Sequence, residues 1–216
     1  MRMYSKSVDY SNKMLAERIR GGRLLDVGGS DFVGRANHLA PLVEEVVIAD
    51  PAPPRGSLAR NVVHSLTPVE AISSALGSFT NVLLSNVLEH LAAPPLAVGK
   101  VWERLSPGGS LHVLSPNCES LNRRIGRLMG ILKDLKEITP QEAALGHRHA
   151  FTVADVIDFL TNAGFVVAEV QGVFLKPLPT DEMIAWPEPR IEAFFTVASQ
   201  LPPEICHEVY FRAVKG

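Results

Sequence analysis

A short apolar segment that ends in an acid and two glycines most constrains how this chain folds. Residues 23–31 read Arg-Leu-Leu-Asp-Val-Gly-Gly-Ser-Asp, so we predict a buried strand that ends in a tight turn at Gly28 and Gly29. Glycine has no Cβ, so the backbone can bend sharply there and a ligand can approach closely. Ser30 and Asp31 are residue types that begin helices. A strand, a glycine turn and a helix at the carboxyl edge of a parallel sheet form the place where open α/β folds bind nucleoside ligands.

The rest of the chain alternates predicted strands with predicted helices, which indicates a parallel sheet with helices on both faces. Besides 23–28, apolar runs typical of strands lie at 45–50, 61–64, 80–85, 110–114, 166–170 and 208–214. An N-terminal helix occupies residues 1–22, and further helical patterns lie at 33–43, 67–76, 94–105, 153–163 and 188–200. The last two strands follow one another without a full crossover, so we expect one antiparallel edge. The prediction is a single α/β domain over residues 1–216.

The segment 117–149 interrupts this alternation and is predicted to be a helical lid insert. It has no strand pattern, and its basic residues are interspersed with Leu, Ile and Met, as in amphipathic helices. It follows the fifth strand, so we expect it over the carboxyl ends of the strands. Arginine forks suit anionic groups, which makes Arg123, Arg124 and Arg127 candidate contacts for an anionic ligand. The alternative is a solvated helix face.

Composition restricts the partners and the compartment. The formal net charge of −2 argues against a general nucleic-acid binder. Cys118 and Cys206 are far apart and lack the spacing of a zinc site, so we expect two buried thiols and no metal site. No apolar run approaches the roughly 18 residues of a membrane span, and residues 1–6 lack the apolar region of a signal peptide. We therefore expect a cytoplasmic protein.

An acid also ends the second predicted strand. Asp26 and Asp50 end consecutive strands, and neighbouring strand ends lie about 5 Å apart. In such a sheet the second acid accepts hydrogen bonds from the hydroxyls of a bound ribose; the alternative is a turn residue before Pro51. The nicotinamide fingerprint G-x-G-x-x-G is absent, because Ser30 and Val33 stand where its later glycines belong. A ligand without a pyrophosphate is therefore favoured.

Five segments resemble the class I S-adenosylmethionine-dependent methyltransferases, especially the small-molecule branch that includes ubiquinone-type and sugar methyltransferases. They are LLDVGG at 24–29, IAD at 48–50, SNVLEHL at 85–91, LSPGGSL at 105–111 and SPN at 115–117. The resemblance extends to HRHAFT at 147–152 and AGF at 163–165, so it covers roughly residues 20–175. It implies a Rossmann-like, doubly wound sheet of seven strands, mostly parallel with an antiparallel last strand. It also implies S-adenosyl-L-methionine as the cofactor.

The resemblance further implies roles for individual positions around the cofactor. Asp26 and the glycine turn would face its methionine part, Asp50 would take the ribose hydroxyls, and Pro51 would lie against the adenine. Leu66 stands near the adenine, where the family often has an acid. The expected cofactor site therefore consists of Asp26, Gly28, Gly29, Ser30, Asp50, Pro51, Leu66, Ser85 and Asn86.

Other residues are candidates for the acceptor side of the site. Removing a proton from a hydroxyl acceptor requires a base, and histidine suits this role near neutral pH. The candidates are His90, His147 and His149, with His149 marginally favoured; the alternative for each is capping or packing. Tyr4 and Tyr10 of the N-terminal helix are candidates to close over the ligand, with packing as the alternative.

The function that these features predict is methyl transfer to an O or N atom of a small molecule, such as a sugar, a sugar nucleotide or a natural-product intermediate. Ser30, Phe32 and Leu66 depart from the family pattern. The alternative is therefore a non-catalytic, methyltransferase-like binding subunit. We expect no nucleic-acid partner, no membrane span, and a monomer or homodimer.

Overall fold

Seven strands form one mixed sheet in the computed structural model, which describes the backbone of residues 2–216 and the side chains from residue 8 onward. The strand order is β3-β2-β1-β4-β5-β7-β6. The strands are β1 (Arg23–Val27), β2 (Glu45–Ala49), β3 (Val62–Ser65), β4 (Phe79–Ser85), β5 (Leu105–Pro116), β6 (Phe165–Phe174) and β7 (Glu208–Lys215). β1 and β4 are parallel, but β2 and β3 are added on one side of β1 whereas β4 and β5 are added on the other. This switch point is where open α/β sheets bind ligands.

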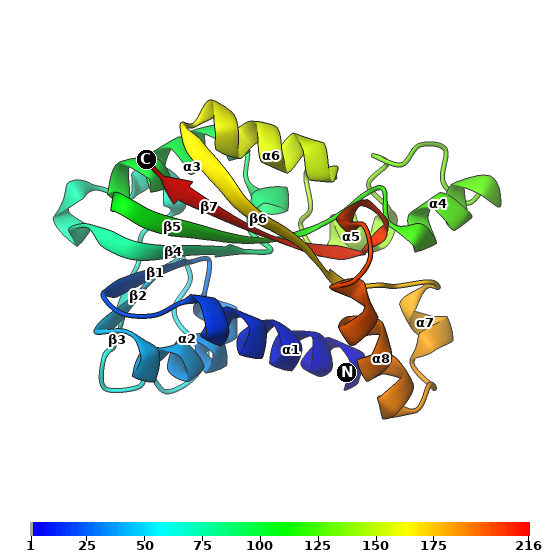
Figure 1. Ribbon diagram of the computed structural model, residues 1–216, viewed down its shortest axis with the longest axis horizontal. Helices are drawn as coiled ribbons and strands as arrows, with labels where there is room; N and C mark the ends of the chain where they lie inside the picture. Colours follow the sequence, from blue (N-terminus) through cyan, green and yellow to red (C-terminus); the bar gives the residue numbers. More distant parts are fainter. Residues whose placement is uncertain (1) are drawn as a thin grey trace.

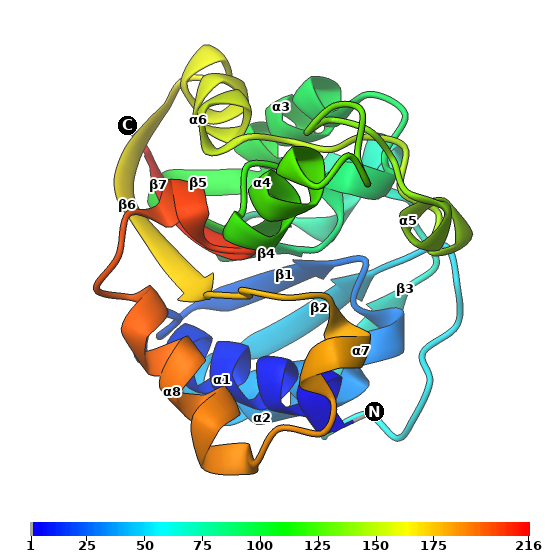
Figure 2. The ribbon, with the colours of Figure 1, turned by 90° about the vertical axis from the view of Figure 1, so that its right-hand side faces the viewer.

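Helices cover both faces of the sheet, as the alternating pattern predicts. One face carries α1 (Arg2–Arg18), α2 (Val33–Leu39) and α8 (Glu188–Ala198), and the other carries α3 (Pro94–Arg104) and α6 (Val153–Asn162) (Figure 1). The shorter helices α4 (Leu121–Leu128), α5 (Pro140–Ala144) and α7 (Thr180–Met183) lie toward the carboxyl edge of the central strands (Figure 2). The Rossmann-like, doubly wound prediction is confirmed.

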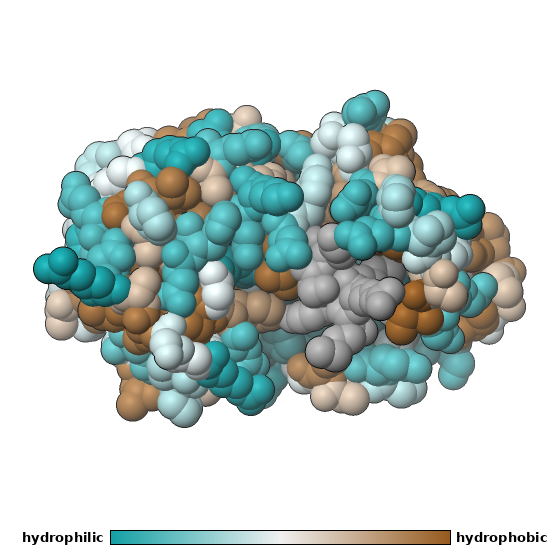
Figure 3. Space-filling model, turned by 90° about the horizontal axis from the view of Figure 1, so that it is seen from below, coloured by the Kyte–Doolittle hydropathy of each residue, from teal (hydrophilic) through white to brown (hydrophobic). Residues whose placement is uncertain are grey.

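The alternation of side chains along each strand divides the core into two layers. Leu25 of β1 belongs to the layer under α3 and α6, whereas Leu24 packs in the layer with Leu15 and Ile19 of α1. All four side chains are fully buried. The outer surface seen from the α1 side carries hydrophilic side chains interspersed with smaller hydrophobic areas (Figure 3). In the described part of the chain, no helix combines the length and the apolar character that crossing a membrane requires.

The structure corrects three predicted details. The helix expected over 67–76 is two separate 3-10 turns, because Ile72 takes an extended ψ of 120° and is buried. The strand expected over 110–114 begins at Leu105, and the predicted turn at 106–109 is an irregularity in its pairing with β4. The last strand is antiparallel as predicted, but β7 lies inside the sheet because it pairs with both β5 and β6.

A buried histidine joins the middle of the sheet. His112 of β5 is fully buried, with Nδ1 2.7 Å from the Tyr210 hydroxyl and Nε2 3.2 Å from Oδ1 of Asn81. The amide oxygen of Asn81 only accepts, so Nε2 carries the proton and Nδ1 accepts from Tyr210. Burial, together with the charges of Arg212 and Arg18, lowers the pKa of His112 to about 3.

We expect His112 to make stability depend on pH. Its folded pKa lies below the ordinary value of 6.5, so below that pH the unfolded chain binds more protons and stability falls as pH falls. The advantage in unfolding free energy of the wild type over His112→Gln should therefore shrink by about 1.4 kcal/mol for each pH unit below about 6.5. Urea denaturation between pH 7 and about 5 measures it, with the exposed His38→Gln as control. A pH-independent difference for His112→Gln would contradict the assignment.

Candidate functional site

The turn after β1 is built so that only glycine fits. Gly28 has a φ of +72°, and its N–H donates to the carbonyl of Ala49 on β2 at 2.9 Å. A Cβ on Gly28 would lie 2.9 Å from Cγ2 of Val87, and one on Gly29 would lie 2.5 Å from Oδ2 of Asp26. The turn is therefore packed tightly between the β1 carboxylate and the loop after β4.

Asp26 brings an unpartnered carboxylate oxygen to this turn. The side chain is 1% exposed, and no described residue donates a hydrogen bond to its Oδ2 atom. Burial raises the pKa of Asp26 to about 6, with Arg35 opposing the rise and Asp50 adding to it. Buried acceptors in native proteins almost always have a donor, so Oδ2 is suited to a ligand donor such as an amine or an ordered water.

Asp50 holds the turn and the end of β2 together. Its Oδ2 accepts from the Ser30 N–H at 3.1 Å, and its Oδ1 accepts from the Ala52 N–H at 2.8 Å. The Ser30 hydroxyl donates to the Ala52 carbonyl at 2.8 Å and lies 3.1 Å from Nε2 of His64. A carboxylate offers about four lone-pair positions, so Asp50 retains capacity for ribose hydroxyls. Pro51 and Leu66 are exposed on either side of the strand ends.

The end of β4 supplies two further polar groups. Ser85 is buried, and its hydroxyl has no hydrogen-bond partner among the described residues. Asn86 has a φ of 53°, and it is the one non-glycine residue with positive φ in the described chain. Its side-chain amide donates to Oε1 of Glu208 at 3.2 Å. Asparagine tolerates this conformation better than most residues, and such positions cluster at functional sites.

These features fit a ligand that combines a ribose with an amino-acid tail. Asp50 and Asp26 flank a turn without Cβ atoms, and Asp26 and Ser85 each carry a buried polar atom without a partner. The predicted cofactor residues therefore lie together at one edge of the sheet. Their contacts with a bound cofactor stay predictions.

Glu89 is a site residue that the sequence analysis missed. It lies in the 3-10 turn Leu88–His90, it is 1% exposed, and neither carboxylate oxygen has a hydrogen-bond partner among the described residues. Burial, together with the charge of Glu208, raises the pKa of Glu89 to about 8. The available signal was an acid between Leu88 and Leu91, inside an otherwise apolar run.

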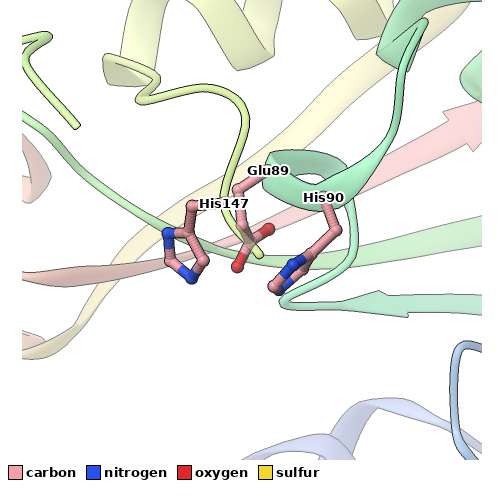
Figure 4. Close-up of side chains that lie close together, drawn as sticks. All are labelled: Glu89, His90 and His147. Carbon is pink, nitrogen blue, oxygen red and sulfur yellow. The ribbon is translucent and has the colours of Figure 1, made fainter. Parts of the chain in front are cut away.

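The structure brings two of the three predicted histidines to this acid. The Glu89 carboxylate lies beside the rings of His90 and His147 (Figure 4), whose centroids are 4.8 Å apart at an angle of 84°. Burial and the neighbouring His90 lower the pKa of His147. His149 instead places Nε2 3.0 Å from the Leu91 carbonyl and stacks on Phe151, so its ring joins two chain segments. The geometry therefore favours His90 and His147 over His149 for contact with an acceptor.

The arginines of the lid segment differ in their surroundings. Arg123 is buried and pairs with Glu142 at 2.7 Å between Nη1 and Oε1, and it also donates to the Leu135 carbonyl. It therefore holds two parts of the lid together. Arg124 is exposed and donates to a backbone carbonyl, whereas the exposed side chain of Arg127 makes no hydrogen bond or ion pair with the described residues. Arg124 and Arg127 are the better placed of the three to meet an anionic acceptor.

Tyr10 packs against α8. Its ring stacks on Phe195 at 5.0 Å, in a cluster that contains Phe174 and Ile191. The contacts of Tyr10 are therefore those of a packed side chain. Its closing over the ligand stays a prediction. The side chain of Tyr4 lies outside the described side chains.

Comparisons with known proteins agree on the fold and the family. A family model described as a methyltransferase domain matches residues 2–170. The YcgJ protein from Bacillus subtilis has a TM-score of 0.65 and 15% identity, covering 96% of this chain and 98% of that chain. An S-adenosylmethionine-dependent methyltransferase from Mesorhizobium loti has a TM-score of 0.59 and 14% identity, covering 89% and 90%.

A third similar structure is that of the N-methyltransferase NodS from Bradyrhizobium japonicum WM9 in complex with S-adenosyl-L-homocysteine. Its TM-score is 0.55 at 16% identity, with 98% of this chain and 86% of that chain covered. No curated protein matches the chain by sequence. The family model spans most of the chain, so the chain belongs to the S-adenosylmethionine-dependent methyltransferase family, as the sequence predicts.

We expect Gly29→Ala to destabilise the fold. The added methyl group would lie 2.5 Å from a carboxylate oxygen of Asp26, whose buried side chain has little room to move. Overpacking of this kind costs about 1–3 kcal/mol, which urea denaturation measures.

Gly34→Ala is the matched control, because a Cβ there meets nothing within 4 Å and the residue lies in α2. Alanine should stabilise this helix by about 0.5–1 kcal/mol. Equal unfolding free energies of Gly29→Ala and the wild type would contradict the tight packing of Gly29 against Asp26.

Proposed function

We propose that this protein transfers a methyl group from S-adenosyl-L-methionine to an O or N atom of a small molecule. The observation that carries the proposal is the pair of acids at neighbouring strand ends. Val27 and Ala49 pair in register, so Asp26 and Asp50 lie on either side of the glycine turn. Both acids retain acceptor capacity at the switch point of the sheet.

The chain's own groups suit each part of the cofactor. Asp50 accepts hydrogen bonds from ribose hydroxyls with its remaining lone pairs, and the exposed Leu66 and Pro51 supply apolar surface for the adenine. Asp26 accepts from the amine of the methionine part. Ser85 supplies a hydroxyl that has no partner among the described residues.

When bound, the cofactor supplies a methyl carbon that the acceptor atom takes as the carbon–sulfur bond breaks and its electron pair stays on sulfur. The protein's task is to align the acceptor with that bond and to exclude water. Alignment of this kind lowers a barrier by roughly 7–11 kcal/mol in favourable cases. The lid segment, with α4 and α5, lies toward the same edge of the sheet as the glycine turn (Figure 2). It is placed to cover the acceptor.

A hydroxyl acceptor must also lose its proton. Glu89, His90 and His147 lie together at the loop after β4, and Val87 of the same loop lies against the glycine turn. We propose that these three side chains promote the loss of the hydroxyl proton. General catalysis of proton transfer contributes about 10²–10⁴-fold.

An anionic small molecule is the acceptor class that we favour. Arg124 and Arg127 expose guanidinium groups on the lid, which suit a carboxylate or a phosphate. Sugars, sugar nucleotides and natural-product intermediates with such a group fit this arrangement. The resemblance implies a glycine at position 30, and the hydroxyl of Ser30 donates to the Ala52 carbonyl and lies against His64, with no hydrogen bond to Asp26. That placement favours an enzyme over a non-catalytic binding subunit.

Isothermal titration with S-adenosylmethionine and S-adenosylhomocysteine tests the proposal. The wild type should bind both, and Asp50→Ala should bind at least about tenfold more weakly, because hydrogen bonds to a charged group are worth about 1.5–3 kcal/mol. Asp31→Ala is the control, since Asp31 is exposed and pairs with Arg55 at the surface.

Asp50→Ala also removes the acceptor of two backbone N–H groups, so thermal melting and a second variant, Asp50→Asn, keep folding and binding separate. Absence of any heat with the wild-type protein would support a non-catalytic binding subunit. Equal affinity of wild type and both Asp50 variants would remove the ribose role. Release of S-adenosylhomocysteine in the presence of anionic acceptors identifies the reaction.

A further inference from the structure

We propose that Glu89, His90 and His147 bind one divalent transition-metal ion beside the acceptor. One carboxylate oxygen and one nitrogen from each ring all lie within 4.8 Å of one another, and the three side chains lie side by side (Figure 4). The proposal rests on the proposed function and names how these three side chains promote proton loss. It departs from the sequence-based expectation of no metal site, which considered the two cysteines.

The backbone holds the three side chains in place before any ion binds. Glu89 and His90 are adjacent in one 3-10 turn. The carbonyl of Glu89 accepts the N–H groups of Arg148 at 2.8 Å and His149 at 3.2 Å, which ties the segment carrying His147 to that turn. The bond of the His149 ring to the Leu91 carbonyl adds a second tie. A cluster assembled from two distant segments is thus anchored by backbone contacts.

The Glu89 carboxylate is the group that points to a ligand. It is 1% exposed, and both of its oxygens lack a hydrogen-bond partner among the described residues. A buried polar group without a partner costs free energy, and a native fold tolerates it where something binds. A cation held by the carboxylate and the two imidazoles removes this cost.

The surroundings have room and suitable charge for an ion. Glu89 and His147, but not His90, line a cavity of about 20 Å³ beside the cluster, which is enough for one water-sized occupant. Arg123 lines the same cavity, but its charge is balanced by Glu142 at 2.7 Å. Glu208 lies close enough to Glu89 to act on it electrostatically, and it adds negative charge.

The donor set selects the class of ion. Two imidazole nitrogens and one carboxylate oxygen suit Zn²⁺, Fe²⁺, Mn²⁺ or Co²⁺, whereas Mg²⁺ and Ca²⁺ prefer oxygen ligands. Tetrahedral ligands at about 2.1 Å from an ion are about 3.4 Å apart, so side chains that now lie within 4.8 Å of one another must rotate closer together when the ion binds. Three protein ligands leave positions open for an oxygen of the acceptor.

An ion bound by these three side chains would activate a hydroxyl group of the acceptor. Its positive charge lowers the pKa of a hydroxyl bound to it, so the hydroxyl proton passes to solvent before the oxygen forms its bond to the methyl carbon. The ion also fixes the position of that oxygen at the loop that packs on the glycine turn. This arrangement suits an oxygen acceptor rather than a nitrogen acceptor.

Titration of the metal-free, untagged protein with Zn²⁺, Mn²⁺ and Co²⁺ tests the proposal. We expect one ion per chain and, for Co²⁺, a visible absorption spectrum of imidazole–carboxylate coordination. Glu89→Gln and His147→Ala should each weaken binding by at least about 100-fold, because even loss of a group that only supports a ligand costs 10–100-fold. His38→Gln, an exposed histidine on α2, should bind as the wild type does.

Binding of S-adenosylhomocysteine is measured on the same samples, together with thermal melting. Cofactor-product binding without stoichiometric metal binding by the wild type would overturn the metal site alone and leave an ordered water as the cavity's occupant. Metal binding without binding of the cofactor product would overturn the proposed function and keep the metal site. Unchanged metal affinity in folded Glu89→Gln and His147→Ala would overturn the assignment of the ligands. If Glu89→Gln fails to fold, His90→Gln takes its place.

Discussion

The parallel pairing of β1 with β2 is the constraint on which the site depends. It brings Asp26 and Asp50 to one edge of the sheet, and the Asp50 carboxylate then accepts the N–H groups of Ser30 and Ala52. These two hydrogen bonds join the glycine turn to the loop after β2. The proposed cofactor surface is therefore formed by backbone pairing, and the acids need no contribution from the lid to be in place.

The edge of the sheet concentrates polar groups that are costly to bury. Asp26, Ser85 and Glu89 each bury polar atoms for which no described residue is a partner. Some other buried polar groups are paired, as at His112, where both ring nitrogens have partners. Buried atoms of Trp102, Arg104, Ser120, Asn122 and His207 also lack a hydrogen-bond partner among the described residues. The unpartnered oxygens of Asp26, Ser85 and Glu89 at this edge are groups for which a bound ligand can supply the missing partners.

Much of the fold follows from local sequence, because strands buried on both faces are apolar runs and acids that follow them lie at the carboxyl edge. This local pattern was sufficient to predict that Asp26, Asp50 and the glycine turn lie together at the carboxyl edge of the sheet. The position of β7 between β5 and β6 could not be predicted from the sequence, since the order of strands depends on long-range pairing. The pairing of Arg123 with Glu142 and the burial of Glu89 depend on how the lid segment folds back, which periodicity does not report.

A crystal structure with S-adenosylhomocysteine bound is the most direct test that the acids at the two strand ends form the cofactor site. We expect the ribose hydroxyls within hydrogen-bond distance of the Asp50 carboxylate, the amine of the homocysteine part on Oδ2 of Asp26, and the sulfur facing Glu89 and His90. A ligand bound away from Asp50, or side chains filling the space beside the glycine turn, would contradict this account.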